Sequence, residues 1–247
     1  MVKLIHTADL HLDSAFRSRF TKEEAENRRQ KQLMAWKELL SFAVEKKVQG
    51  ILIAGDLFDS PVVSHGTMDF FLSTVSEHPE ISFFYLRGNH DTENTFRYQE
   101  NLPKNLFLFS EKGKKYRLND RLLLAGVEYG TKDISFGENE GATQGAGQTA
   151  EQGVGQENVH GAEALSKSGS ESEEESKFLK LKEEDCNILL LHGALYQGTP
   201  KGEAVQGEEG IFLKNLEKLP LSYIALGHIH KGGEGKLNNG ALWAYPG

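Results

Sequence analysis

The chain has 247 residues, of which 38% are hydrophobic, and a formal net charge of −8. This composition suffices for one folded core. Its single cysteine, Cys186, excludes an intramolecular disulfide and disfavours a thiolate metal site. No segment approaches the roughly twenty apolar residues of a membrane span, and the apolar stretch after Lys3 is too brief for a secretory signal. We therefore expect one domain over residues 1–247, in the cytoplasm and without a membrane partner.

The first part of the chain alternates between strand and helix patterns. Apolar runs at 2–8, 50–54 and 81–86 predict buried strands. The capping-box sequence Thr21-Lys22-Glu23-Glu24 predicts a helix that ends near residue 47, and 64–77 predicts a second helix. This order predicts a parallel sheet with functional residues at the carboxyl ends of its strands.

The later elements begin where the helices stop and a hairpin starts, with three short strands at 106–109, 114–118 and 122–127 joined by turn-prone Lys112-Gly113 and Asn119-Asp120. The alternation then resumes. The expected elements are a strand at 187–191, a helix at about 208–219, a strand at 221–226, and final strands near 235–237 and 241–244.

Residues 137–176 interrupt this order with Gly, Gln, Ser, Glu and Ala, and contain no aromatic residue and no proline. Such a segment cannot bury enough apolar surface to order itself, so we expect a disordered acidic insertion. Residues 137–185 hold 12 of the 36 acidic and 4 of the 28 basic side chains, which leaves the rest of the chain neutral. Charge alone therefore neither predicts nor excludes nucleic-acid binding. A flap at the site entrance is the alternative role for the insertion, and unchanged activity after deletion of 138–175 would exclude it.

Five short polar clusters each follow an apolar run. Any one of them is more simply explained as turn chemistry or a capping residue. Together they supply carboxylate, amide and imidazole donors at several strand ends, which is what a pair of divalent cations requires. The clusters are Asp9-Leu10-His11, Gly55-Asp56-Leu57-Phe58-Asp59, Gly88-Asn89-His90-Asp91, Leu191-His192-Gly193 and Gly227-His228-Ile229-His230.

This set resembles the calcineurin-like metallophosphoesterase superfamily, whose pattern is D-x-H, GD, GNH[D/E], H and GHxH. Within it, the segments His6–Asp13, Gly55–Asp59 and Tyr223–Lys231 are most similar to the SbcD and YhaO branch of DNA-repair nucleases. The resemblance implies an α/β (α+β) fold, a four-layer sandwich of two mixed β-sheets flanked by helices, with the site at one end. It also implies phosphoester hydrolysis by a water-derived nucleophile, without a covalent enzyme intermediate.

The resemblance further implies a metal-ligand set in which Asp56 bridges two ions. In both D-x-H and H-x-H, one intervening residue would let two side chains point the same way from an extended segment, while Leu10 and Ile229 face the core. Oxygen and nitrogen donors suit Mn²⁺, Fe²⁺ or Zn²⁺, and the branch favours Mn²⁺. The implied ligands are Asp9, His11, Asp56 and His230 for one ion, and Asn89, His192, His228 and Asp56 for the other.

Several neighbouring residues are given other roles. By resemblance, His90 faces the substrate and stabilises or protonates the leaving oxygen, and Asp91 orients its ring. Arg87 either binds a substrate phosphate or pairs with a carboxylate such as Asp59 or Glu93, and we favour the ion pair. His6 and His65 are expected to be core or supporting residues, because the ligand set is complete without them.

The final Tyr245-Pro246-Gly247 resembles a sequence that, in SbcD-type proteins, precedes more chain. We expect that the C-terminal capping domain and the region that docks an SMC-like coiled-coil ATPase are absent. DNA, such an ATPase and a second copy of the chain are the expected partners. A phosphatase or cyclic-nucleotide phosphodiesterase, and a scaffold with a decayed metal site, are the alternative functions.

Overall fold

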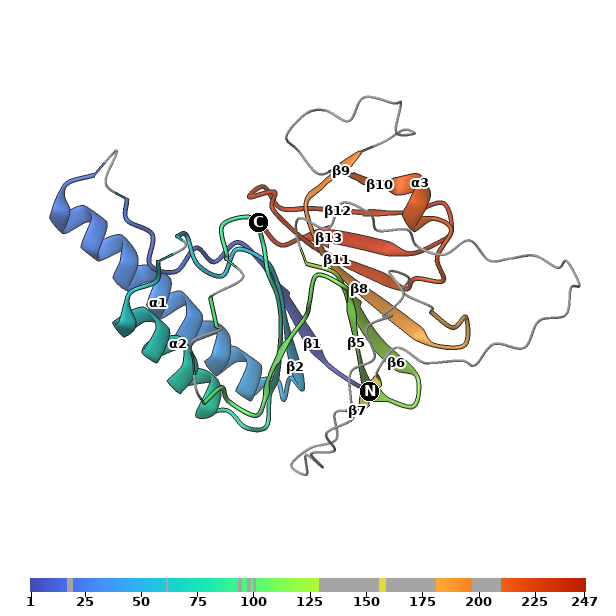
Figure 1. Ribbon diagram of the computed structural model, residues 1–247, viewed down its shortest axis with the longest axis horizontal. Coiled ribbons are helices and arrows are strands. Elements are labelled where there is room, and N and C mark those ends of the chain that lie inside the picture. Colours follow the sequence, from blue (N-terminus) through green and yellow to red (C-terminus); the bar gives the residue numbers. More distant parts are fainter. Residues whose placement is uncertain are drawn as a thin grey trace, which may run out of the picture.

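The computed structural model describes residues 1–16, 20–60, 62–92, 95–96, 99, 101–128, 156–158, 181–196 and 210–247. A first sheet lies beside two long helices (Figure 1) and has the strand order β1-β2-β3-β4. All of its neighbouring strands are parallel, so this sheet is not mixed as expected. Its strands are β1 (Leu4–Thr7), β2 (Gly50–Ala54), β3 (Ser82–Leu86) and β4 (Leu106–Leu108).

The second sheet has seven described strands in the order β12-β13-β11-β8-β6-β5-β7. It is mixed: the predicted hairpin β5–β6 and the pair β12–β13 are antiparallel, and the other pairs are parallel. Its strands are β5 (Lys114–Asn119), β6 (Leu122–Gly126), β7 (Gln156–Asn158), β8 (Cys186–His192), β11 (Tyr223–Gly227), β12 (Gly233–Lys236) and β13 (Leu242–Tyr245).

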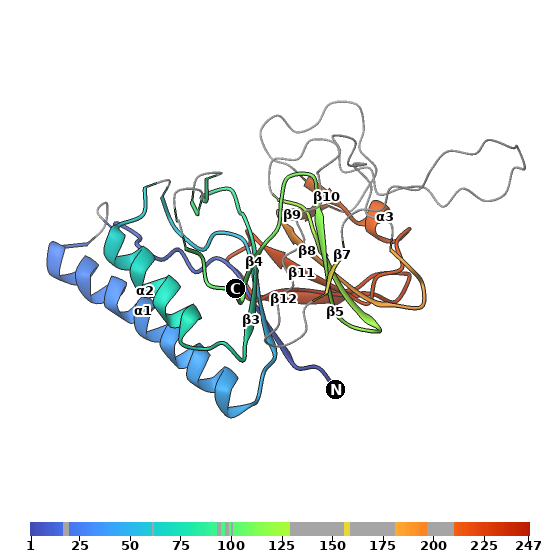
Figure 2. The same ribbon diagram turned by 60° about the horizontal axis from the view of Figure 1, so that its bottom comes forward.

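Helices α1 (Lys22–Glu45) and α2 (His65–Ser76) cover the outer face of the first sheet (Figure 2). The predicted capping box is present, because Thr21 and Glu24 each bond the other's main-chain N–H. Trp36 of α1 is 1% exposed and donates its ring N–H to Thr74 of α2 at 2.9 Å, which ties the two helices together. Their inward faces pack on β2 and β3 through one continuous apolar cluster.

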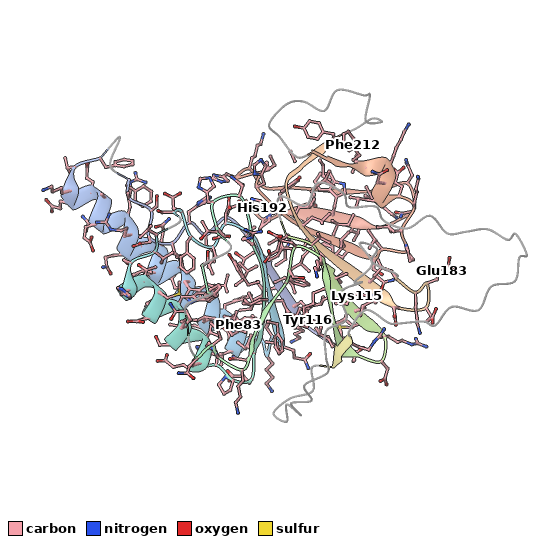
Figure 3. All side chains as sticks on the ribbon, in the orientation of Figure 1. Phe83, Lys115, Tyr116, Glu183, His192 and Phe212 are labelled. Carbon is pink, nitrogen blue, oxygen red and sulfur yellow. The ribbon has the colours of Figure 1, made fainter. Side chains whose placement is uncertain are left out.

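A second apolar cluster fills the space between the two sheets. Leu52 and Phe84 come from the first sheet, and Leu124, Leu190 and others from the second. Figure 3 shows Tyr116 of β5 among these side chains, where its hydroxyl donates to the main-chain carbonyl of Leu108. Because the sheets are joined by this packing, the carboxyl ends of their central strands are held in a fixed relation.

One predicted element was wrong. In place of a helix over 208–219, Gly210–Phe212 forms strand β10, which pairs in parallel with β9 (Ala194–Tyr196). Only Leu213–Leu216 is helical, as α3, whose Leu216 packs on the outer face of the second sheet. Ile211 and Phe212 are residue types that favour a strand, and β9 supplies a partner strand that the sequence pattern did not reveal.

Most of the acidic insertion lies outside the described residues. The exception is β7, whose three residues pair with Lys115–Arg117 of β5. The expected flap therefore stays a prediction. Among the described helices, none is long and apolar enough to cross a membrane.

Candidate metal centre

The five polar clusters meet where β1, β2, β3, β8 and β11 end. Two glycines make this approach possible, because a Cβ on Gly227 would lie 1.9 Å from the carbonyl oxygen of Ala54, and one on Gly88 would lie 2.2 Å from Asp56 Oδ1. Only glycine lets these segments lie so close together. Figure 3 shows His192 at this junction of the two sheets.

The segments that follow β1 and β2 run side by side. Four main-chain hydrogen bonds join them, so the candidate ligands on one segment are held against those on the other. These bonds run from Asp9 N to Gly55 O (3.0 Å), His11 N to Asp56 O (3.0 Å), Leu12 N to Leu57 O (2.9 Å) and Asp59 N to Leu12 O (3.2 Å).

The backbone at four of the candidate ligands is not extended, which corrects the sequence-based explanation of how the D-x-H and H-x-H side chains are directed. Asp9, His11, Asp56 and His228 have positive φ angles of 53°, 44°, 50° and 95°. Non-glycine residues seldom adopt this region, and such strain is often found at functional sites. The intervening residues nevertheless pack inward as expected, Leu10 against the helix-side core and Ile229 against the core of the second sheet.

Asp9, His11 and His230 form one ligand group. The Nε2 atoms of His11 and His230 are 3.1 Å apart, and His230 Nε2 lies 3.8 Å from Asp9 Oδ1. The main-chain N–H of His228 donates to both oxygens of Asp9, at 2.9 and 3.0 Å, which fixes that carboxylate.

Asn89, His192 and His228 form the other group. Asn89 Oδ1 lies 2.8 Å from His192 Nε2 and 3.0 Å from His228 Nδ1. The Nδ1 of His192 is 2.9 Å from the carbonyl oxygen of Ala54. Since a carbonyl only accepts, this nitrogen carries a proton, and Nε2 is the nitrogen directed into the group.

Asp56 lies between the two groups and is 1% exposed. Its Oδ2 is 3.3 Å from His192 Nε2 and 3.8 Å from His11 Nε2, while its Oδ1 accepts from the main-chain N–H of His90 at 2.8 Å. One carboxylate thus faces both sets of donors.

Burial and the charges of neighbouring residues shift the pKa values of these groups. Burial by itself raises the pKa of Asp56, but the hydrogen bond and charge of His192, together with the His90 N–H and the charge of His11, outweigh it, so the net shift is downward. In the same way, burial lowers the pKa of His192, but Asp56 more than compensates and the pKa rises. Burial raises the pKa of Asp9 and lowers that of His11. Because a cation binds the neutral imidazole, this upward shift makes protonation compete with metal binding at His192.

The donor set fits a pair of divalent ions. It offers carboxylate and amide oxygens and imidazole nitrogens in two groups that share one carboxylate, and it extends from the buried Asp56 and His192 to the exposed Asn89 and His230. Such mixed oxygen and nitrogen donors suit Mn²⁺, Fe²⁺ or Zn²⁺. The predicted ligands Asp9, His11, Asp56, Asn89, His192, His228 and His230 are all brought together.

His90 is exposed beside this centre, and its ring packs edge-on against His11 with centroids 4.9 Å apart. The structure places Asp59, rather than Asp91, next to its ring: His90 Nδ1 is 3.4 Å from the main-chain oxygen of Asp59. Asp91 is buried and accepts from the main-chain N–H groups of Gly88, Leu57 and Phe58. Asp91 therefore holds the loop that carries Asn89 and His90.

Arg87 forms ion pairs as expected, with two glutamates that the sequence interpretation did not name. Its Nε lies 3.1 Å from Glu128 and its terminal nitrogen 2.8 Å from Glu111. Of the anticipated partners, Glu93 lies outside the described residues. The side chain is only 12% exposed, so the structure supports an ion-pair role for Arg87.

The two remaining histidines differ. His6 lies 3.0 Å from the hydroxyl of Tyr223, across the two sheets, and burial lowers its pKa to about 4. His65 is exposed at the start of α2, so its expected core or supporting position was wrong.

The sequence interpretation missed two residues whose side chains lie beside the candidate ligands or the turn next to them. The hydroxyl of Tyr245 donates to the carbonyl of Gly193 at 2.8 Å and accepts from Leu195 N at 3.0 Å, so it holds the turn after His192. Asp59 lies 3.1 Å from His11 Nδ1. Asp59 belonged to a recognised cluster, but nothing in the sequence reveals which imidazole it faces.

A pH-dependent contribution to stability is expected from Glu128. Its side chain is 15% exposed, and burial raises its pKa to about 7 from an ordinary 4.5, although Arg87 opposes the shift. The folded state therefore retains a proton that the unfolded state loses, and this stabilisation is complete below pH 4.5 and lost as the pH rises to about 7. Relative to Glu128→Gln, the wild-type free energy of unfolding should fall by about 1 to 3 kcal/mol over that range.

Urea unfolding between pH 4.5 and 8 measures this difference, and Glu38→Gln on the exposed face of α1 controls for loss of a surface charge. A pH-independent difference between the wild type and Glu128→Gln would contradict the prediction.

The fold and the centre together define a metal-dependent hydrolase of phosphoesters. A family model described as calcineurin-like phosphoesterase matches residues 2–232, and the chain belongs to this family. Over 130 residues, it is 30% identical to the DNA double-strand break repair protein Mre11 of Methanosarcina acetivorans, and 29% identical to the Mre11 protein of Methanosarcina mazei. These alignments cover 51% of this chain and only 19% and 18% of the two relatives.

Proposed function

We propose that this chain is a two-metal phosphodiesterase that cleaves DNA, the catalytic domain of a repair nuclease of the SbcD and YhaO type, with Mn²⁺ as its preferred ion. The observation that carries the proposal is the position of Asp56 between two donor groups, with the exposed His90 at their edge. The similarity to two DNA double-strand break repair proteins supports DNA as the substrate.

In this proposal, Asp56 bridges the ions, Asp9, His11 and His230 complete one site, and Asn89, His192 and His228 complete the other. When bound, the ions would lower the pKa of water and neutralise charge on the phosphoryl oxygens. The chain's own contribution is to hold these ligands rigidly. The Gly227 and Gly88 contacts keep the segments close, and the His228 N–H fixes Asp9.

His90 is proposed to act at the leaving oxygen. Its Nδ1 faces the main-chain oxygen of Asp59, which can only accept, so the neutral ring carries its proton on Nδ1 and leaves Nε2 for the substrate. Its imidazolium form could donate from Nε2 to the departing oxygen. A positioned proton donor typically contributes about 10² to 10⁴-fold in rate.

The test is hydrolysis by the full chain with Mn²⁺, Fe²⁺ or Zn²⁺ on four substrates: single-stranded DNA, duplex ends, bis-p-nitrophenyl phosphate and p-nitrophenyl phosphate. We expect cleavage of DNA and of the diester, highest with Mn²⁺ and abolished by EDTA. His90→Ala should retain Mn²⁺ binding and lose about 10² to 10⁴-fold in turnover. Activity confined to the monoester would support a phosphatase and overturn the nuclease assignment, and full turnover by His90→Ala would remove its catalytic role.

Partners follow from the same branch resemblance. We propose an SMC-like coiled-coil ATPase and a second copy of the chain as protein partners, besides DNA. Sedimentation of the purified chain tests self-association, and co-purification with such an ATPase tests the other. A monomer at all accessible concentrations would exclude the dimer.

A further inference from the structure

We infer that Gln32 of α1 is a positioning residue for the candidate metal centre, because its side-chain amide holds the main chain of the segment that carries His11. The inference rests on the proposed function, in which His11 binds an ion. The hydrogen bonds concerned join Gln32 to main-chain carbonyls, so the contact itself can be tested in the metal-free protein.

The segment after β1 is bonded through its N–H groups to the segment after β2. The main-chain N–H groups of Asp9, His11 and Leu12 donate to carbonyls there, at 2.9 to 3.0 Å. The carbonyl groups of the same segment need other donors. The segment also has an unfavourable backbone, since φ is 53° at Asp9 and 44° at His11. Such a conformation persists only where its surroundings hold it.

Gln32 supplies a donor from the helix. Its Nε2 lies 3.2 Å from the carbonyl oxygen of His11 and 3.4 Å from that of Leu10, so one amide group bridges two successive carbonyls. Carbonyl oxygens only accept, which means that the amide must present its nitrogen to them. Gln32 lies one turn before Trp36, whose buried ring is bonded to Thr74. The donor therefore stands on a firmly packed part of α1.

The other end of the same amide is not satisfied. Gln32 Oε1 is buried and has no hydrogen-bond partner among the residues that the structure describes. A buried acceptor without a partner costs stability, and an apolar side chain of similar size would avoid that cost. Packing of α1 alone therefore does not explain a glutamine at this position, whereas its bonds to the ligand-bearing segment do.

Gln32→Leu separates these two effects, because it removes the donor and the unsatisfied acceptor together. We expect the urea unfolding midpoint to stay at or above the wild-type value. In the metal-free protein, hydrogen exchange of the His11 and Leu12 main-chain amides should become about 3- to 10-fold faster, which corresponds to the loss of one hydrogen bond. Titration calorimetry with Mn²⁺ should show one of two sites weakened by a similar factor.

Two further variants sharpen the comparison. Gln32→Glu keeps the shape of the side chain but has no N–H group when ionised, so it should also speed the exchange and weaken the same Mn²⁺ site. Gln30→Leu is the matched control, since Gln30 is exposed on the same helix and its amide bonds Glu26 at 3.1 Å. It should leave exchange at His11 and Leu12, and both Mn²⁺ affinities, as in the wild type.

Unchanged Mn²⁺ affinity in Gln32→Leu would overturn the inference, whether or not the unfolding midpoint falls. If that variant does not fold, Gln32→Glu and the wild type decide. One side-chain amide proton of Gln32 should exchange slowly in the wild type, and free exchange of both protons would contradict the contact. Failure of the proposed function looks different: the wild type would bind no Mn²⁺ and cleave no ester, while exchange at His11 and Leu12 would still depend on Gln32.

Discussion

Replacement of Asp56 by asparagine should lower phosphodiester hydrolysis by about 10³-fold or more and weaken the binding of both ions. The amide keeps the shape of the side chain and an oxygen for the His90 N–H, but it lacks the charge that faces both donor groups. Metal ions stabilise transition states of this kind by several kcal/mol, and about 4 kcal/mol corresponds to roughly 10³-fold in rate. Hydrolysis of bis-p-nitrophenyl phosphate and calorimetric titration with Mn²⁺ measure the two effects.

The matched control is Asp69→Asn, the same change on the exposed face of α2. It should leave rate and metal stoichiometry as in the wild type. Retention of two Mn²⁺ sites with unchanged affinity in Asp56→Asn would show that this carboxylate does not bridge them.

Replacement of Gly227 by alanine should destabilise the fold by about 3 kcal/mol or more. The added Cβ would lie 1.9 Å from the carbonyl oxygen of Ala54 and 2.7 Å from His192 Nδ1, so β11 must move away from β2. Overpacking against rigid main chain costs about 1 to 3 kcal/mol and sometimes more. The same shift would separate His228 from Asn89 and weaken metal binding. Urea unfolding and Mn²⁺ titration measure both effects.

Gly66→Ala provides the control, because a Cβ at this helical position in α2 meets nothing within 4 Å. We expect it to be neutral or to stabilise the protein by up to about 1 kcal/mol. If Gly227→Ala were as stable as Gly66→Ala, the two sheets would be free to separate at the site. That result would contradict the fixed relation between the carboxyl ends of β2 and β11.

Local patterns predicted most of the elements. The capping box at Thr21 and the apolar runs of β2, β3 and β8 identified the helix and strands to within a few residues, because caps and buried runs act over short distances. Gly210–Phe212 was misassigned, since its strand forms only by pairing with β9. Strand formation at an isolated short segment depends on a neighbour that is distant in the sequence.

The sequence by itself determined which residues are chemically able to bind a metal ion. Carboxylates, an amide and imidazoles at the ends of apolar runs predicted a metal site before any geometry was known, and the family resemblance of these clusters implied the seven candidate ligands. Only the tertiary structure decided their partners: Asp59 beside His11 and His90, Asp91 on main-chain amides, and Arg87 with Glu111 and Glu128. The reason is physical. Residue type sets which bonds a side chain can make, whereas its neighbours depend on two sheets packed together and on left-handed turns that have no clear local pattern.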